Sequence, residues 1–288
     1  MENILKLKEK ALGLLRKKKY EEAYPLLVEI VEKDPRDAVF RDILLGICSV
    51  LEKYGEGLKA AEKAVELFPE KGDFYYYKGY FMLTLETAER VVEMGELKIY
   101  RKPSLNPERL EECVKMFEKA IEKGTTFLGE AWKLKGDAFL HLKRWEEAIE
   151  AYDRAAEEYG EESEILYNKG KALVRLERWE EAAEAMDKVL KEEPDAAAFF
   201  YKGLALFHLK RYEDALTAFG EVIKLAPHFH EVYFYRWLIL ESLGRNEEAK
   251  KEYEKYLGDS EIVGVEREVE FNGDYMDILD DMLSDLES

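Results

Sequence analysis

The stretch Arg144-Trp145-Glu146-Glu147-Ala148 decides the fold, because the same five-residue phrase returns along the chain. With small changes it recurs as Lys19-Tyr20-Glu21-Glu22-Ala23, Arg178-Trp179-Glu180-Glu181-Ala182, Arg211-Tyr212-Glu213-Asp214-Ala215 and Arg245-Asn246-Glu247-Glu248-Ala249. The alanines that end the last four phrases are separated by 34, 33 and 34 residues. A period of this length and regularity is typical of a repeat protein.

Each phrase lies between two patterns of helical period. Upstream of Ala148, the residues Trp132, Gly136 and Phe139 stand at i, i+4 and i+7. Downstream, Ala148, Tyr152 and Ala155 repeat that spacing. The acidic pair of the phrase suits the start of a helix, where the helix dipole favours negative charge. A glycine or proline then ends the second helix, at Pro35, Pro69, Gly160, Pro194 and Pro227.

These residues resemble the tetratricopeptide repeat. That family has a large residue at repeat position 4, a small one at 8, a large one at 11, alanine at 20 and 27, an aromatic at 24 and proline at 32. The best matches are Trp132, Gly136, Phe139, Ala148, Tyr152 and Ala155, then Leu166, Gly170, Leu173, Ala182, Met186 and Pro194, then Phe199, Gly203, Leu206, Ala215, Phe219 and Pro227. In the last unit Trp237 stands where a small residue is expected, which puts the local helix spacing in doubt.

The resemblance covers roughly residues 4–258 and about seven units. It implies an all-α fold in which tandem helix-turn-helix repeats stack as a right-handed α-solenoid. No unit can bury its apolar face alone, so stacked neighbours form one continuous core. The tryptophan or tyrosine that recurs at position 17 is interpreted as packing between helices.

The resemblance also implies a function. Such a protein is expected to be a scaffold or adaptor for other proteins, without enzymatic activity and without a cofactor. Its partner, a peptide or helix, is expected on the concave face lined by the first helices. The residues at positions 5 and 9 of those helices are Tyr76, Tyr80, Lys133, Tyr167, Lys171, Phe200, Leu204, Phe234 and Leu238. The last four are predicted to form an apolar strip suited to an amphipathic helix.

The family's best-known binding mode, a carboxylate clamp for the acidic C-termini of chaperones, is not predicted. Lys133 and Asn168 match the clamp pattern, whereas Asp137, Ala197 and Tyr201 do not. The carboxylate of Asp137 would repel an acidic ligand.

The third unit holds an insertion of about 22 residues, at about 84–107. The pattern predicts a first helix extended from Phe74 to about Met94, followed by a loop over residues 96–103. Asn106-Pro107 then predicts a helix cap with proline at the first helical position. A basic, aromatic patch in the insertion is either a solvated connector or a contact site for an acidic partner or the chain's own tail. It comprises Lys98, Tyr100, Arg101 and Lys102.

Residues 259–288 differ chemically from the repeat region 1–258. They contain eleven acids and one base. Their apolar residues fall at helical spacing with acids opposite, and a helix here is expected to be stable only when docked. The stripe comprises Tyr275, Ile278, Leu279, Met282, Leu283 and Leu286. This tail would cap the last repeat, fill the groove of its own or a second copy, or remain free. Filling the groove would gate partner binding.

The composition excludes several other classes of protein. A net charge of −19 argues against nucleic acid as a partner, because phosphate binding needs a basic surface. No apolar run approaches the roughly 20 residues that span a bilayer, and no signal peptide is visible, so the protein is expected to be cytoplasmic. The absence of Gln, with abundant Glu and Lys, suggests a thermophile.

No metal or catalytic site is predicted. Cys48 and Cys113 lie far apart and form no metal-binding pair, and His228 and His230 lack a third ligand. His141 and His208, both at position 13, are interpreted as solvated residues at helix ends. The favoured function is therefore an adaptor with a regulatory or capping tail. The alternative is a structural subunit that forms homo-oligomers through its tail or its terminal repeats.

Overall fold

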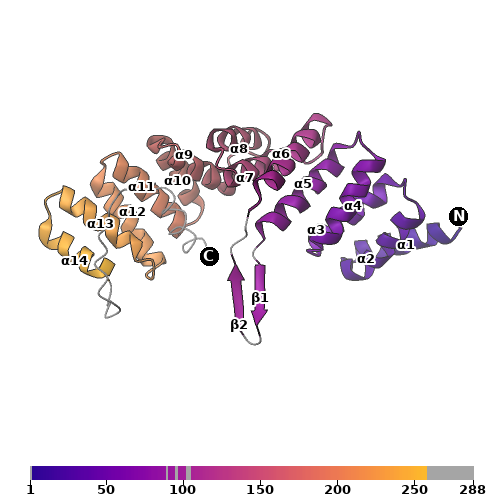
Figure 1. Cartoon of the computed structure of the whole chain (residues 1–288), viewed down its shortest axis with the longest axis horizontal. Helices are drawn as coiled ribbons and strands as arrows, with labels where there is room; N and C mark the ends of the chain where they lie inside the picture. Colours follow the sequence, from indigo (N-terminus) through magenta and orange to yellow (C-terminus); the bar gives the residue numbers. More distant parts are fainter. Residues whose placement is uncertain (1, 89, 95–96, 102–104, 258–288) are drawn as a thin grey trace. The chain divides into compact units, whose positions relative to one another are not determined.

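The computed structural model describes residues 2–88, 90–94, 97–101 and 105–257. Fourteen helices in these ranges follow one another as seven pairs (Figure 1). The pairs are α1 (Glu2–Arg16) with α2 (Tyr20–Lys33), α3 (Ala38–Val50) with α4 (Tyr54–Leu67), α5 (Gly72–Thr87) with α6 (Pro107–Glu122), α7 (Leu128–His141) with α8 (Trp145–Tyr159), α9 (Ser163–Arg175) with α10 (Trp179–Glu192), α11 (Ala196–His208) with α12 (Tyr212–Leu225), and α13 (Glu231–Ser242) with α14 (Asn246–Leu257). The predicted series of helix-turn-helix units is confirmed.

The recurring phrase builds the turn and the start of each second helix. The residue before it adopts a left-handed backbone in four repeats, as does the equivalent Glu52 of the second repeat, with φ between 54° and 59°. Gly244 takes this place in the seventh repeat. The arginine of the phrase then bonds the acid three residues on. Arg211, for example, donates from Nη2 to Asp214 at 2.7 Å, and Arg245 donates from Nη2 to Glu248 at 2.5 Å. These pairs are exposed, so they contribute little to stability.

The glycine at position 8 lets the two helices of a unit approach. A Cβ placed on Gly136 would lie 2.6 Å from the ring of Tyr152, and one on Gly203 would lie 2.6 Å from the ring of Phe219. Both rings come from position 24 of the facing helix and are fully buried. The glycine at position 8 therefore leaves the space that the ring at position 24 occupies.

In the seventh repeat, the contact between positions 8 and 24 is made by different residues. Trp237 replaces the glycine, and its ring packs against Tyr253 from position 24 with 4.9 Å between centroids. Tyr253 is 38% exposed, whereas Tyr152 and Phe219 are fully buried. The tryptophan is accommodated because its partner lies nearer the surface, and α13 and α14 still pair.

The chain divides into two compact units, Met1–Gly160 and Glu161–Ser288. The first holds α1–α8, with a core that includes Phe81, Phe117 and Tyr152. The second holds α9–α14, and its core includes Phe200, Phe219 and Tyr235. The single repeat region expected over residues 1–258 stays a prediction.

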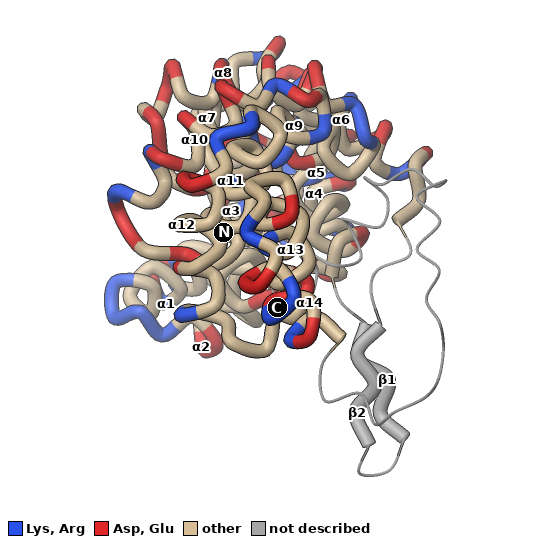
Figure 2. Tube along the Cα trace, turned by 90° about the vertical axis from the view of Figure 1, so that its left-hand side faces the viewer, with Lys and Arg blue, Asp and Glu red and all other residues tan. Residues whose placement is uncertain are grey.

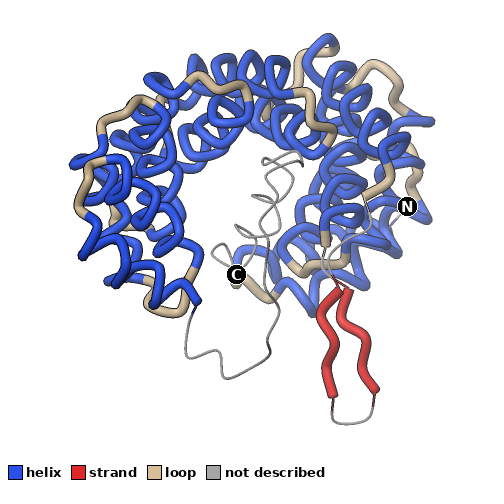
Figure 3. The backbone as a smooth tube through the Cα atoms, turned by 60° about the vertical axis from the view of Figure 1, so that its left-hand side comes forward, coloured by secondary structure: helices blue, strands red, loops and turns tan. Residues whose placement is uncertain are grey.

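The insertion corrects the sequence prediction. Helix α5 ends at Thr87 rather than near Met94, and β1 (Arg90–Met94) pairs in antiparallel register with β2 (Leu97–Arg101) (Figure 3). The stretch predicted as a loop is thus mostly the second strand of a hairpin. Lys98, Tyr100 and Arg101 lie on β2, and Lys102 lies outside the described residues.

The cap predicted at Asn106 is confirmed. Its side chain accepts hydrogen bonds from the backbone N–H groups of Glu108 (2.9 Å) and Arg109 (3.3 Å), with proline as the first helical residue. The acidic tail, 259–288, with all six residues of its apolar stripe, lies outside the described residues.

Candidate functional site

The compact unit Met1–Gly160 presents tyrosines on α5. Tyr80 is half-buried, and its phenol oxygen accepts a hydrogen bond from Ser49 Oγ at 3.1 Å. The ring of Tyr54 meets it edge-on at 6.4 Å. Tyr76 is buried and stacks on Phe127 at 4.4 Å, and its ring lies nearly parallel to that of Tyr80 with 6.3 Å between centroids. Burial raises the pKa of Tyr76, which keeps its phenol protonated. Of the two predicted residues, Tyr80 is therefore the accessible one.

Lys133, on α7 of the same unit, is held by its own helix. Its ammonium lies 3.6 Å from the carboxylate of Glu130, three residues earlier, and only 13% of its side chain is exposed. A partner acid would have to compete with Glu130 for this charge.

The compact unit that begins at Glu161 places Tyr167 and Lys171 together on α9. The Lys171 ammonium lies 5.5 Å from the centre of the Tyr167 ring, within reach of a cation–π interaction. Tyr167 also meets Tyr201 of α11 edge-on at 5.8 Å. Both predicted residues are half-buried. They form a joined aromatic and cationic surface on α9, with the buried Tyr201 of α11 against one edge of the tyrosine ring.

The predicted apolar strip in the second unit is not an open surface. Phe200 and Leu204 have no exposed area, and Phe234 is 8% exposed. Phe200 packs among Phe219 at 5.6 Å, Phe229 at 5.2 Å and Tyr235 at 5.4 Å. These residues belong to the core. Leu238 alone of the four is half-buried.

The position-17 residue Trp179 is confirmed as a packing residue. Its indole stacks on His208 of the next repeat at 4.0 Å, with the two ring planes within 4° of each other. The imidazole therefore has one covered face, and burial there lowers its pKa. His208 is a packed residue rather than the simply solvated one that its place at the helix end suggested.

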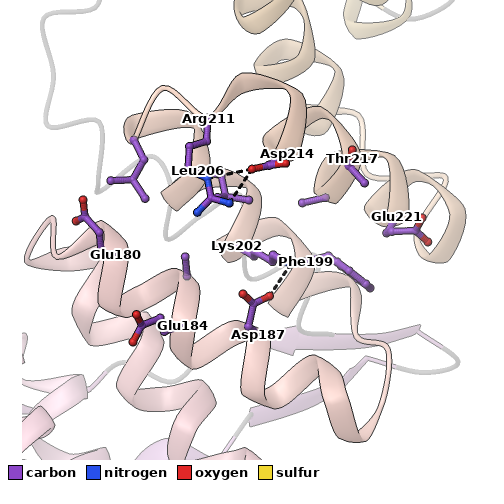
Figure 4. A pocket seen from close by; sticks show the side chains of 13 residues that line it. Glu180, Glu184, Asp187, Phe199, Lys202, Leu206, Arg211, Asp214, Thr217 and Glu221 are labelled. Carbon is purple, nitrogen blue, oxygen red and sulfur yellow. Dashed lines mark hydrogen bonds and ion pairs between the residues drawn. The ribbon is translucent and has the colours of Figure 1, made fainter.

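Sequence reasoning missed a groove of about 320 Å³ between α10 and α12 (Figure 4). One wall is α10, with Glu180, Glu184 and Asp187 at i, i+4 and i+7. The other wall is α12, with Asp214 and Glu221. Apolar residues lie between the walls, and these are Phe199 and Leu206 of α11 and Leu209 just after it. Only Glu180 and Asp214 belong to the acidic pairs that begin the second helices, so the repeat pattern alone does not group these five acids.

Reactive groups are few in the described part of the chain. Burial raises the pKa of the Cys48 thiol to about 11 and that of Cys113 to about 12. Both cysteines are unpaired and buried, so they are poor nucleophiles. No group of three or more His, Cys, Asp or Glu side chains among the described residues could hold a metal ion.

A family described as tetratricopeptide repeat matches residues 108–163, 167–228 and 209–261, just over half of the chain. The chain belongs to the tetratricopeptide-repeat family. This agrees with the seven helix pairs and with the glycine contacts at position 8. The all-α repeat fold predicted from the phrase is confirmed.

Solved structures of other tetratricopeptide-repeat proteins share this fold at low sequence identity. YrrB, described as having an unusual peptide-binding site, is 21% identical with a TM-score of 0.57, covering 70% of this chain and 93% of its own. A repeat protein from Parabacteroides merdae is 13% identical with a TM-score of 0.55 and covers both chains fully. A double mutant of MamA from RS-1 is 19% identical with a TM-score of 0.54, covering 66% and 94%. No curated protein sequence matches the chain.

Within the family, the site departs from the carboxylate clamp. Asp137 accepts a hydrogen bond from the hydroxyl of Tyr152 at 2.7 Å, so it serves as an internal acceptor at a place where the clamp needs an amide. No helix in the described ranges combines the length and the apolar character needed to cross a membrane.

Proposed function

We propose that this tetratricopeptide-repeat protein is an adaptor that binds a segment of a partner protein on the surface of its first helices. The observation that carries the proposal is the pairing of accessible tyrosines with hydrogen-bonding or cationic neighbours in both units. Tyr80 lies beside Ser49 and Tyr54, and Tyr167 lies beside Lys171. Tyrosine combines an apolar ring with a polar tip and is therefore enriched at protein interfaces.

Two further facts support a peptide ligand. The repeat fold is typically an interaction module, and YrrB, which shares the fold, is described as having a peptide-binding site. The polar groups beside Tyr80 and Tyr167 favour a ligand that offers hydrogen-bond acceptors as well as apolar side chains. A peptide with carboxylates between apolar residues meets both needs, and the chain's own tail has that composition.

The binding face is tested with full-length bait in an affinity capture from lysate of the source cells. Tyr80→Ser and Tyr167→Ser are expected to reduce recovery of a stoichiometric partner at least tenfold, because a buried aromatic anchor contributes about 2 kcal/mol or more. Tyr253→Ser is the matched control, since Tyr253 is an exposed tyrosine on a second helix. Equal recovery with all three variants would exclude the first-helix surface as the binding face.

The tail completes the proposal as an internal competitor. Replacing Ile278 and Leu283 by Asp in the full chain removes the apolar stripe and is expected to tighten partner binding, because a docked tail lowers apparent affinity. Ser284→Asp adds charge outside the stripe and serves as the control. Unchanged affinity in the double variant, measured by titration with the captured partner, would leave the adaptor intact and remove the gating role.

A further inference from the structure

The groove between α10 and α12 holds two carboxylates that no cation neutralises. Three of its five acids are in ion pairs, with Asp187 beside Lys202 at 2.5 Å, Asp214 beside Arg211 at 2.7 Å and Glu221 beside Lys224 at 2.6 Å. Glu180 and Glu184 form no ion pair with any residue that the structure describes. Both are exposed and stand one helical turn apart on α10, where like charges repel each other. A cationic ligand would relieve this repulsion.

The floor of the groove is apolar, so charge alone does not define the ligand. Phe199 and Leu209 are half-buried and leave apolar surface open between the walls, next to the buried Leu206 (Figure 4). The acids of both walls are marked in red in Figure 2. A small polar cation would leave the floor in contact with water. The matching ligand carries an aliphatic group for the floor and positive charges for the acidic rim.

The length of the groove suits a short segment of extended chain. On the α10 wall, Glu180 and Asp187 lie two helical turns apart, roughly 10 Å along the helix axis. Three or four residues of extended chain span that length at about 3.3 Å each. Neighbouring side chains of such a segment point to opposite sides, so an aliphatic residue on the floor leaves its neighbours at the mouth. From there, the long side chains of lysine or arginine reach the carboxylates of the rim.

The charge of the groove excludes the chain's own tail as the ligand. Residues 259–288 contain eleven acids and one base. The unpaired glutamates of the groove would repel such a segment. The ligand is therefore sought in another protein.

We propose that the α10–α12 groove binds an extended basic segment of a partner protein, in which an aliphatic residue lies between lysines or arginines. Glu180 and Glu184 would bind its basic side chains, and Phe199 and Leu209 would contact its aliphatic residue. The tyrosine surfaces proposed for partner binding favour a peptide with carboxylates, whereas this groove favours cations. The two sites share no residue, so either proposal stands without the other.

The test is fluorescence anisotropy of a dye-labelled peptide, Lys-Leu-Lys-Leu-Lys, titrated with the purified full chain at about 0.05 M and about 0.5 M salt. Saturable binding is expected at low salt and weaker binding at high salt, because salt screens the exposed glutamates. Glu180→Lys with Glu184→Lys is expected to weaken binding about tenfold, since two attractive contacts become repulsive. The absence of saturable binding to the parent chain would overturn the proposal.

Glu146→Lys with Glu150→Lys is the matched control. These exposed residues occupy the same two positions in α8, the second helix of the preceding repeat, and the substitutions make the same change of net charge. The control is expected to bind the peptide like the parent. Equal weakening in both double variants would show a general effect of charge and overturn the proposal.

The peptide Lys-Ser-Lys-Ser-Lys tests the floor without altering the protein. It has the same charge, and its binding is expected to be about tenfold weaker because serine buries no aliphatic group. Equal binding of the two peptides would show that charge alone attracts them and would overturn the proposed ligand.

A second copy of the chain is the competing occupant of the groove. In sedimentation velocity at low salt, the parent and Glu180→Lys with Glu184→Lys are expected to show the same mass. Association of the parent that this double variant loses would assign the groove to a second copy and overturn the proposal of a partner segment.

Discussion

At the scale of single residues, the glycines at position 8 make a sharp prediction about packing. A Cβ on Gly203 would lie 2.6 Å from the ring of Phe219, which is itself bounded by Phe200 and Tyr235. The ring cannot move away without disturbing both neighbours. Gly203→Ala is therefore expected to lower the free energy of unfolding by about 1–2 kcal/mol, because overpacking of about 1–3 kcal/mol exceeds the helix propensity gained by alanine. Urea denaturation measures the change.

Two other glycines are the controls. The Cβ of Gly170→Ala would meet the terminal methyl of Met186, which is flexible, so a change near zero is expected. Gly13→Ala would meet nothing and is expected to raise stability by about 0.5–1 kcal/mol. An equal loss of unfolding free energy at all three positions would show that helix geometry, rather than the facing side chain, sets the requirement for glycine.

At the scale of elements, the insertion shows which part of the fold the sequence could not predict. Apolar residues at 85, 88 and 92 fit a helix, while Val91, Val92 and Ile99 fit strands, and the local pattern does not decide between them. The structure decides through a long-range contact. Glu86, at the end of α5, is buried and accepts hydrogen bonds from the backbone N–H of Asn106 at 2.6 Å and from Arg109 at 3.1 Å. Those partners lie 20 and 23 residues away.

Glu86 is therefore expected to join the two ends of the insertion. Glu86→Ala would leave the N–H of Asn106 without its acceptor and is expected to cost about 1.5–3 kcal/mol, the range for hydrogen bonds to a charged group. Glu112→Ala is the comparison, since its carboxylate is 49% exposed and lies 3.7 Å from Lys78, and its loss is expected to stay within about 0.5 kcal/mol. Thermal unfolding of both variants checks this. A small loss of stability in Glu86→Ala would mean that helix packing alone keeps the two ends of the insertion together.

The sequence predicts only part of the candidate site, because contacts between distant residues decide which side chains are exposed. The repeat position identifies the side of a helix on which a residue lies, so it placed Tyr80, Tyr167 and Lys171 on a side that the structure leaves half-buried. It does not identify what covers that side. Phe200 is covered by Phe229, which belongs to the turn after α12, and by Tyr235 of α13. Repeat periodicity carries no information about such turn residues. It also gave no reason to group Glu184, Asp187 and Glu221 with the helix-start acids Glu180 and Asp214, because these five residues come together only when α10 and α12 are placed side by side.

At the scale of the whole molecule, repeat architecture predicts how a local defect spreads. In a stack of repeats, stability is a sum over units and the contacts between neighbours, so a perturbation is felt mainly nearby. The chain divides into two compact units at residues 160 and 161. Gly203→Ala in the second unit is therefore expected to speed amide hydrogen exchange in α11 and α12 first. The reciprocal variant, Gly136→Ala, displaces Tyr152 in the first unit and is expected to act on α7 and α8.

Hydrogen exchange followed by mass spectrometry of peptic fragments separates the alternatives. If each defect stays in its own unit, the protection of α3–α6 is unchanged in Gly203→Ala, because local opening needs only the contacts of the affected repeats. If both variants raise exchange uniformly from α2 to α13, the two units unfold as one cooperative body. That second result would mean that the boundary near residue 160 is a feature of the packing and has no energetic consequence. A partner or second copy held by one unit would then stabilise the other to the same degree.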